Sequence, residues 1–256
     1  MRKEFYDTHA HLYSRDFVNE YPDVISRARR LGVTKIILPN IDLKTIEDML
    51  GLSDFYPNMC FPSLGLHPSS VTQNYREDLE KISEYFNQRD FVAIGETGID
   101  LYWDKSFEKE QIESFKIQLG WAKEKNLPII IHTRKSFDLV IKTVQEAGDG
   151  IRGIFHCFSG SLEEAKKIIS LGNFKMGLGG VVTFKNSGVQ EVVEKIPLEH
   201  FVLETDAPYL APVPYRGKRN ESSYIVKVAE KIAEIKNCSL EEVAEKTFKN
   251  AEEIFK

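Results

Sequence analysis

Short apolar runs alternate with longer segments of helical period about eight times along this chain of 256 residues. Such alternation favours parallel strands joined by helical crossovers, because parallel strands need a long connection between them. The predicted strands are Phe5 to His9, Thr34 to Pro39, Met59 to His67, Phe91 to Glu96, Leu127 to His132, Gly153 to His156, Phe174 to Gly179 and His200 to Thr205. Eight repeats over about 250 residues predict an α/β fold, a single (β/α)8 barrel of the TIM type. A doubly wound open sheet is the alternative, because spacing alone does not show closure.

The segments between these runs carry apolar residues at spacings of three and four, as amphipathic helices do. Helices are predicted at Tyr21 to Leu31, Arg76 to Phe86, Phe107 to Lys125, Phe137 to Ala147, Leu162 to Leu171, Gly188 to Ile196, Ser222 to Lys236 and Ser239 to Phe255. No linker rich in Gly, Ser and Pro and no low-complexity segment divides the sequence. Residues 1–256 are therefore expected to form one domain.

Charge and composition narrow the classes of function. The chain has 34 Lys and Arg against 39 Asp and Glu, a net charge of −5. Domains that coat nucleic acid are instead strongly basic, with a pI above about 9. Any contact with nucleic acid must therefore be local. No apolar run approaches the ~20 residues of a membrane span, and the N-terminus lacks a signal peptide, so a cytoplasmic protein without membrane association is expected. Nothing in the sequence calls for an obligatory protein partner.

The cysteines indicate neither a disulfide framework nor a thiolate metal site. Cys60, Cys157 and Cys238 are far apart, odd in number, and include no CxxC pair. We expect them to be reduced and mostly buried.

Most of the predicted strands end in a residue that can bind a metal or move a proton. These strand-end residues, which include five of the six histidines, are His9, His11, His67, Glu96, His132, His156 and Asp206. The carboxyl ends of all strands in a parallel barrel open on one face, so these side chains are expected to converge. His9 and His11 lie two residues apart on an extended segment and would point the same way as a chelating pair.

This set offers imidazole and carboxylate ligands without a thiolate, which suits zinc, manganese, nickel, iron or magnesium and does not choose among them. With five or six of these residues available as ligands, two divalent ions bridged by a carboxylate are favoured over one. Glu96 is the expected bridge, since its strand lies between the first strand and those carrying His132 and His156. Two such ions would activate water and stabilise the attacking and leaving oxygens of a displacement, which predicts a hydrolase.

Further charged residues lie near the predicted site. Asp7 and Glu204 each precede a candidate ligand by two residues, so each is expected to orient an imidazole or a water molecule, or to form a structural salt bridge. After the last strand, the segment 216–219 carries three cations that could bind phosphate. The candidate substrate contacts here are Arg216, Lys218 and Arg219. Arg134 and Lys185 are further candidates for contact with phosphate.

Seven short motifs span nearly the whole chain. They are Asp-Thr-His-Ala-His-Leu at 7–12, Gly-Leu-His-Pro at 65–68, Gly-Glu-Thr-Gly-Ile-Asp at 95–100, His-Thr-Arg at 132–134, His-Cys-Phe-Ser-Gly at 156–160, Glu-Thr-Asp-Ala-Pro-Tyr-Leu at 204–210 and Arg-Gly-Lys-Arg-Asn at 216–220. With these motifs the chain resembles the TatD family of metal-dependent deoxyribonucleases, within the amidohydrolase-like group of barrels.

The resemblance implies two ligand sets that share one carboxylate. The first ion would be held by His9, His11, Glu96 and Asp206, and the second by Glu96, His132 and His156. It also implies that His67 contacts the substrate or its phosphate without being a firm ligand. Members of the wider group often bridge their metals with a carboxylated lysine, and Glu96 at this position favours the nuclease-like branch.

The leading hypothesis is a phosphodiesterase that trims DNA ends, with RNA ends as a further candidate substrate. Asp206, Glu96 and His67 would be its catalytic residues, with His67, Arg134, Arg216, Lys218 and Arg219 contacting the substrate. The alternative enzyme is an ester or amide hydrolase acting on a small molecule or an aminoacyl-tRNA. A metal-binding or nucleic-acid-binding scaffold without activity is disfavoured, because the ligand set is complete.

Overall fold

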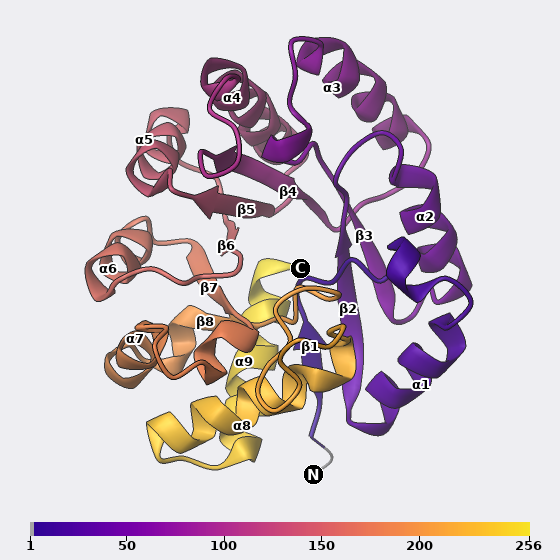
Figure 1. Cartoon of the computed structure of the whole chain (residues 1–256). Helices are drawn as coiled ribbons and strands as arrows, with labels where there is room; N and C mark the ends of the chain where they lie inside the picture. The colour runs from indigo at the N-terminus through magenta and orange to yellow at the C-terminus, as the bar shows by residue number, and fades with distance from the viewer. Residues whose placement is uncertain (1–2) are drawn as a thin grey trace.

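A computed structural model describes residues 3–256 as eight strands surrounded by helices (Figure 1). The strands are β1 Phe5–Asp7, β2 Val33–Pro39, β3 Cys60–Leu64, β4 Ala93–Asp100, β5 Ile129–Arg134, β6 Gly153–Phe155, β7 Phe174–Leu178 and β8 Phe201–Leu203. The α-helices are α1 Tyr21–Arg30, α2 Ile46–Phe55, α3 Tyr75–Glu84, α4 Glu108–Glu124, α5 Phe137–Ala147, α6 Leu162–Ser170, α7 Val189–Lys195, α8 Ile225–Lys236 and α9 Leu240–Ile254. Neighbouring strands pair in parallel in the order of the sequence.

Backbone hydrogen bonds join the last strand to the first. Thr8 N–H donates to the Leu203 carbonyl at 3.0 Å, and Asp206 N–H donates to the His9 carbonyl at 2.9 Å. Ala10 and Ala207 form a parallel bridge one step further along. The sheet is therefore a TIM barrel, as predicted, and the alternative of a doubly wound open sheet is wrong.

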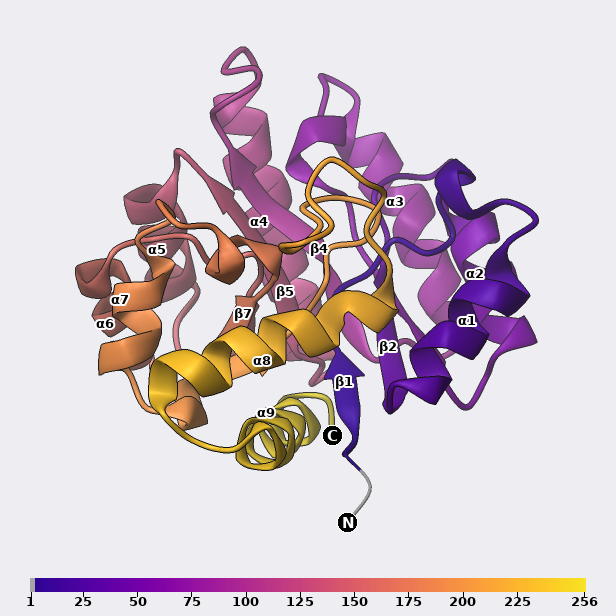
Figure 2. The ribbon, with the colours of Figure 1, turned by 60° about the horizontal axis from the view of Figure 1, so that its bottom comes forward.

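Apolar side chains fill the inside of the barrel, and α9 covers its lower end. The inward cluster consists of Tyr6, Ile37, Ala93, Ile130, Ile154 and Val202, which pack against Ala251 and Ile254 of α9. Burying each large aliphatic side chain contributes about 1.5–3 kcal/mol. In Figure 2 α9 lies beside the start of β1, at the lower end of the barrel, and its contacts with the inward cluster close the amino-terminal end.

Two differences from the predicted elements bear on the site. The predicted helices did not include α2, whose buried Ile46, Met49 and Leu52 follow β2. The prediction that β4 ends at Glu96 is also wrong. This strand continues to Asp100 because its pairing with β5 continues through Gly98 opposite His132, and a register irregularity lies between Ile94 and Thr97. Glu96 therefore sits within the strand, at a bulge that interrupts regular pairing.

Over residues 3–256, the helices are too short or too polar to cross a bilayer.

Candidate metal centre

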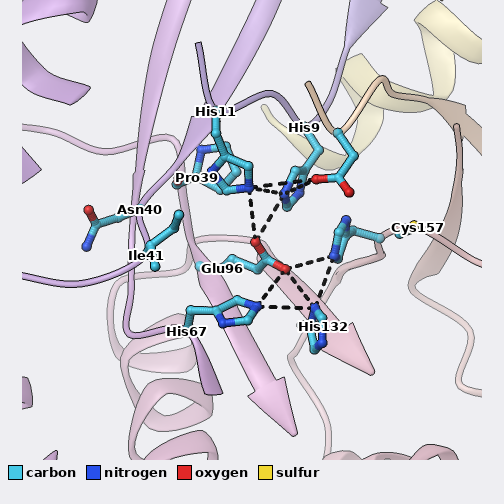
Figure 3. Close-up of polar contacts among 12 residues, drawn as sticks. His9, His11, Pro39, Asn40, Ile41, His67, Glu96, His132 and Cys157 are labelled. Carbon is cyan, nitrogen blue, oxygen red and sulfur yellow. Dashed lines mark hydrogen bonds and ion pairs between the residues drawn. The ribbon is translucent and has the colours of Figure 1, made fainter. Parts of the chain in front are cut away.

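Glu96 lies at the centre of a cluster of histidines at the open end of the barrel (Figure 3). Its Oε2 atom lies 3.1 Å from His9 Nε2 and 3.4 Å from His11 Nε2. Its Oε1 atom lies 2.8 Å from His156 Nε2 and 2.9 Å from His132 Nδ1. The Glu96 side chain is only 4% exposed, so water screens these charges weakly. Each carboxylate oxygen therefore faces its own set of imidazoles, and His67 Nε2, 3.3 Å from Oε1, joins the second set.

The first set of side chains comes from the segments after β1 and β8. His9 and His11 point the same way, with their Nε2 atoms 3.1 Å apart. Asp206 Oδ1 lies 3.7 Å from the first of these nitrogens and 3.8 Å from the second. The backbone bonds that close the barrel between β8 and β1 thus also bring Asp206 to the predicted histidine pair.

The second set comes from β5 and from the segments after β3 and β6. His132 Nδ1 lies 3.4 Å from His156 Nε2 and 3.3 Å from His67 Nε2. The His9 and His156 rings stack with centroids 3.9 Å apart, so the two sets adjoin. The seven strand-end residues selected from the sequence thus lie together, in three overlapping groups able to hold a metal ion.

Asp100, which the sequence analysis did not select, fixes the orientation of His132. Its Oδ2 atom lies 3.0 Å from His132 Nε2, and its Oδ1 atom accepts a hydrogen bond from Tyr102 N–H at 2.9 Å. A proton on Nε2 of His132 is held by this carboxylate, so the lone pair on Nδ1 points toward Glu96. Glu96 and Asp100 are four residues apart on one strand, and the two-residue period of β4 could have revealed the second carboxylate.

Backbone contacts assign a different role to His67. Ser69 N–H donates to His67 Nδ1 at 3.1 Å, so this nitrogen carries the lone pair. The neutral ring then carries its proton on Nε2, which lies 3.3 Å from Glu96 Oε1. In this tautomer Nε2 offers a proton rather than a lone pair, so His67 is a hydrogen-bond donor within the cluster, and the group that includes it would hold an ion through Glu96 and His132.

The ends of β2 and β5 hold Glu96 in place. Glu96 N–H donates to the Asn40 carbonyl at 3.1 Å, and the buried Asn40 side chain donates to the Gly65 carbonyl at 2.8 Å. Gly98 allows β4 to approach β5, because a Cβ atom there would lie 2.0 Å from the His132 carbonyl oxygen. Asn40 and Gly98 were also missed by the sequence analysis, since their roles depend on neighbouring strands.

The donor set fits divalent cations. The Nε2 atoms of His9 and His11 converge at 3.1 Å, and two lone pairs at this distance repel unless positive charge lies between them. Burial and the neighbouring His156 hold the pKa of His9 well below its usual value, which keeps its ring neutral. Burial also lowers the pKa of His156, but Glu96 and Glu204 outweigh it and hold this pKa well above the usual value. The cluster therefore favours positive charge beside Glu96.

Carboxylates of the two sets have pKa values shifted in opposite directions. Burial alone would raise the pKa of Glu96, but the surrounding imidazoles, His156 first, outweigh burial and hold it well below the usual range. Burial raises the pKa of Asp206 to about 6, with His156 and His11 acting against the rise. Glu96 is thus a permanent anion, whereas Asp206 is closer to the basicity of a proton acceptor that works near neutral pH.

Two acids below the cluster differ in their contacts. Glu204 accepts a hydrogen bond from Cys157 N–H at 2.6 Å, and its Oε1 atom faces His156 Nδ1 at 3.6 Å, beyond hydrogen-bond distance. Asp7 instead accepts hydrogen bonds from the Thr205 N–H at 2.9 Å and the Thr205 hydroxyl at 2.7 Å. It therefore ties β1 to the end of β8, and within residues 3–256 it neither orients an imidazole nor forms a salt bridge.

The cations selected after β8 are not equivalent. Arg216 lies over the Phe184 ring at 3.9 Å and lines, with Lys218, a cleft of about 540 Å³ that includes Tyr209. The Tyr209 ring lies 6.3 Å from that of His11, so this cleft adjoins the cluster.

The third cation of that segment is engaged elsewhere. Arg219 pairs with Glu20 at 2.7 Å and donates to the Asp16 carbonyl, so its charge is balanced and it ties this segment to the start of α1. The predicted substrate contact of Arg219 gains no support from this geometry. Lys185 is exposed beside Phe184.

Arg134 lies on the other side of the cluster. It follows His132 by two residues on β5 and lines a separate cleft of about 660 Å³ with Tyr102 and Cys157. The two clefts place Arg134 and Arg216 at different edges of the barrel mouth.

Comparison with known proteins identifies the family. Residues 6–256 match the family described as TatD related DNase. The chain is 42% identical to the uncharacterized metal-dependent hydrolase YabD of Bacillus subtilis, over 98% of both chains. It is 34% identical to the uncharacterized metal-dependent hydrolase YcfH of Escherichia coli, over 97% of this chain and 94% of that protein.

Solved structures agree with this assignment. The crystal structure of YjjV, a TatD homologue from Escherichia coli, superposes with a TM-score of 0.93 at 31% identity, covering 100% of this chain and 99% of that one. A TatD family hydrolase from Entamoeba histolytica superposes with a TM-score of 0.85 at 26% identity and the same coverage. With its barrel, its histidine and carboxylate cluster and these relatives, the chain belongs to the TatD family of metal-dependent hydrolases.

Proposed function

We propose that this hydrolase is a phosphodiesterase that trims the ends of DNA, or of RNA, with two divalent ions bound around Glu96. The observation that carries the proposal is the division of the Glu96 carboxylate, whose two oxygens face separate sets of imidazoles. Such a shared carboxylate is typical of centres with two metal ions, which serve displacement at phosphorus.

The residues for each ion follow from the two sets. His9, His11, Asp206 and Glu96 would hold the first ion, and Glu96, His132 and His156 the second. When bound, the ions would lower the pKa of a water molecule and stabilise negative charge on phosphate oxygens. Zinc, manganese, magnesium and nickel all accept these ligands.

The protein's own side chains would complete the reaction. Asp206 would accept the proton of the attacking water, since its carboxylate lies beside both first-set histidines. His67, with its proton on Nε2, would donate a hydrogen bond to a phosphate oxygen. Arg216 and Lys218, at the edge of the mouth, would bind the next phosphate along the strand.

This function is tested by assaying hydrolysis of a set of substrates by protein loaded with each of the four metals. Single-stranded DNA, RNA, duplex DNA, a bis-aryl phosphate and simple carboxylic esters would be assayed side by side. Hydrolysis of oligonucleotides from their ends, with little action on esters, supports the proposal. Hydrolysis of esters or of aminoacyl-tRNA, with intact oligonucleotides, would replace it with the ester-hydrolase alternative.

Reversing the charge of Arg216 and Lys218 together to Glu should raise KM for oligonucleotides much more than for a small aryl phosphodiester. The small substrate needs the centre but no second phosphate contact. Two contacts to a single strand predict a slope of about −1.4 in log K against log salt, which the double variant should lose. Lys246 and Lys249 on α9, at the closed end of the barrel, give a charge-matched control double variant. An equal loss for both substrates would place the segment's role in the fold rather than in phosphate binding.

Asp100→Asn should weaken metal binding by about 10- to 100-fold. The Asn oxygen would stay with Tyr102 N–H, so its NH2 group would face His132 Nε2 and force the ring proton onto Nδ1, toward the ion. Metal affinity, measured by competition with a chelating dye, reports this change without reference to activity. Asp138→Asn on the outer helix α5 is the control. Unchanged metal affinity in Asp100→Asn would remove this residue from the centre.

A further inference from the structure

Two large aromatic side chains stand exposed beside the metal centre. Trp103 is 73% exposed and Tyr102 is 51% exposed, and both lie in the segment between β4 and α4. Their rings are 4.9 Å apart at an angle of 89°, so they meet edge to face. Exposed aromatic pairs of this kind commonly mark binding sites, because burying them elsewhere in the protein would be favourable.

The register of β4 and β5 places this pair directly above a ligand. Asp100 pairs with Arg134, and Leu101 N–H donates to the Arg134 carbonyl at 2.9 Å. Tyr102 follows Asp100 by two residues, and Arg134 follows His132 by two. Along β5, which contains both His132 and Arg134, two residues of extended strand advance about 6.6 Å, roughly the length of one nucleotide step along a single strand. In Figure 2, where β1 points upward, the segment between β4 and α4 rises above the barrel mouth.

Arg134 packs against both aromatic rings. Its guanidinium carbon lies 4.0 Å from the Tyr102 ring centroid and 5.2 Å from that of Trp103. Within residues 3–256 its guanidinium forms no ion pair with an acidic side chain, unlike that of Arg219. An arginine stacked on an aromatic ring and without an acid partner keeps its charge for an anionic ligand.

The neighbouring cleft has the size for one nucleotide. Tyr102, Arg134 and Lys135 line it, and its volume is about 660 Å³. The two acids in its lining are engaged, since Asp138 pairs with Lys167 and Glu164 accepts from Ser161 N–H. Pockets for small ligands span about 300–1,000 Å³. Aromatic faces bind a planar ring, and Arg134 and Lys135 bind a phosphate, so the combination matches a nucleotide better than a neutral ester or an acyl group.

We propose that Tyr102, Trp103 and Arg134 form a subsite, here called the stacking subsite, that binds a nucleobase of the substrate next to the metal centre. The proposal rests on the proposed nuclease function and specifies what that function recognises. Stacking accepts every base, because each has an aromatic face, so the subsite would favour nucleotides over other phosphodiesters without selecting a sequence.

Binding of a nucleotide to the stacking subsite can be measured without hydrolysis. Trp103 and Trp121 are the two tryptophans of the chain, so Trp121→Phe makes Trp103 the single reporter. In this metal-loaded variant, adenosine 5′-monophosphate should quench the Trp103 emission. Ribose 5-phosphate, which lacks the base, should bind about 5- to 150-fold more weakly and leave the emission nearly unchanged. An unchanged emission with the nucleotide, or equal quenching by both compounds, would overturn the proposal.

A matched pair of oligonucleotides tests the same subsite during turnover. One carries a normal terminal nucleotide and the other an abasic residue with the same phosphates. Wild-type kcat/KM should favour the normal end, and Tyr102→Ser with Trp103→Ser should bring the ratio close to one. Phe55→Ser, which removes another exposed aromatic ring at the far end of α2, should retain the wild-type ratio. A double variant that retains the preference would overturn the proposal.

The two experiments separate this proposal from the proposed function. If the wild type hydrolyses no oligonucleotide, the nuclease proposal is rejected. The fluorescence titration would still decide whether the stacking subsite binds a base. Equal hydrolysis of both oligonucleotides by the wild type would reject the subsite and leave the nuclease in place.

Discussion

Asp206→Asn should lower kcat by about 10²-fold or more on the substrate that the wild type hydrolyses best. Asparagine preserves the shape of the side chain and one oxygen, but it cannot accept the proton of an attacking water. The Asp206 carboxylate lies 3.7 Å and 3.8 Å from the two histidines of the first set, and its side chain is 13% exposed, so a water molecule can reach it. Its burial, which raises the pKa to about 6, gives it the basicity for this role.

The measurement is kcat at saturating metal, with the bound ions counted in the same samples. Saturation separates loss of the base from loss of a ligand, because weaker binding is overcome by excess ion. Asp16→Asn, in the cleft beside Tyr209 but outside the cluster, is the matched control. Turnover near that of the wild type in Asp206→Asn would exclude Asp206 as the proton acceptor.

The convergence of the ligands could be predicted because it depends on local features. A strand ends where its apolar run ends, and in a parallel barrel every carboxyl end opens on one face. Residues such as His9, His11 and His156 therefore meet whatever the details of packing. Their residue types were informative in the same way, since imidazoles and carboxylates without thiolates already imply a site for hard or intermediate divalent ions.

The contacts around these ligands could not be read from the sequence. The proton on His67 Nε2 follows from a hydrogen bond by Ser69 N–H. The support of Glu96 by Asn40 crosses from one strand to another. The pairing of Arg219 with Glu20 joins segments that are 199 residues apart in the sequence. Each depends on which elements pack together, whereas a sequence pattern reports only which residues share a face.

Asp100 lies between these two cases. The four-residue spacing from Glu96 along β4 places both carboxylates on one face, which is a local property. The early end predicted for this strand concealed it, because a strand that stops at Glu96 leaves Asp100 in a loop. Pairing with β5 extends β4 and brings Asp100 to His132. An error of four residues in one strand boundary thus removed a residue from the predicted site.

Glu96→Gln should reduce the bound ions from two to one and lower turnover by about 10³-fold or more. An amide offers one oxygen and one NH2 group, so the side chain can face only one of the two sets with a ligand atom. The lost negative charge would also no longer offset the repulsion between two cations, which disfavours binding of the second ion. Each ion contributes several kcal/mol of charge stabilisation in the transition state, and each 1.36 kcal/mol corresponds to tenfold in rate.

Metal analysis and thermal unfolding check this prediction independently of activity. An ion that binds only the folded protein stabilises it by about 2.7 kcal/mol at a concentration 100 times its Kd, so two ions should stabilise the wild type about twice as much as one ion stabilises Glu96→Gln. Glu221→Gln, which alters another buried carboxylate paired with Arg27 outside the cluster, should retain both ions. Two ions in Glu96→Gln would show that Glu96 does not bridge them. A single ion in the wild type would reject the two-ion proposal itself, and the oxygens of Glu96 would then face one ion and one hydrogen-bonded set of histidines.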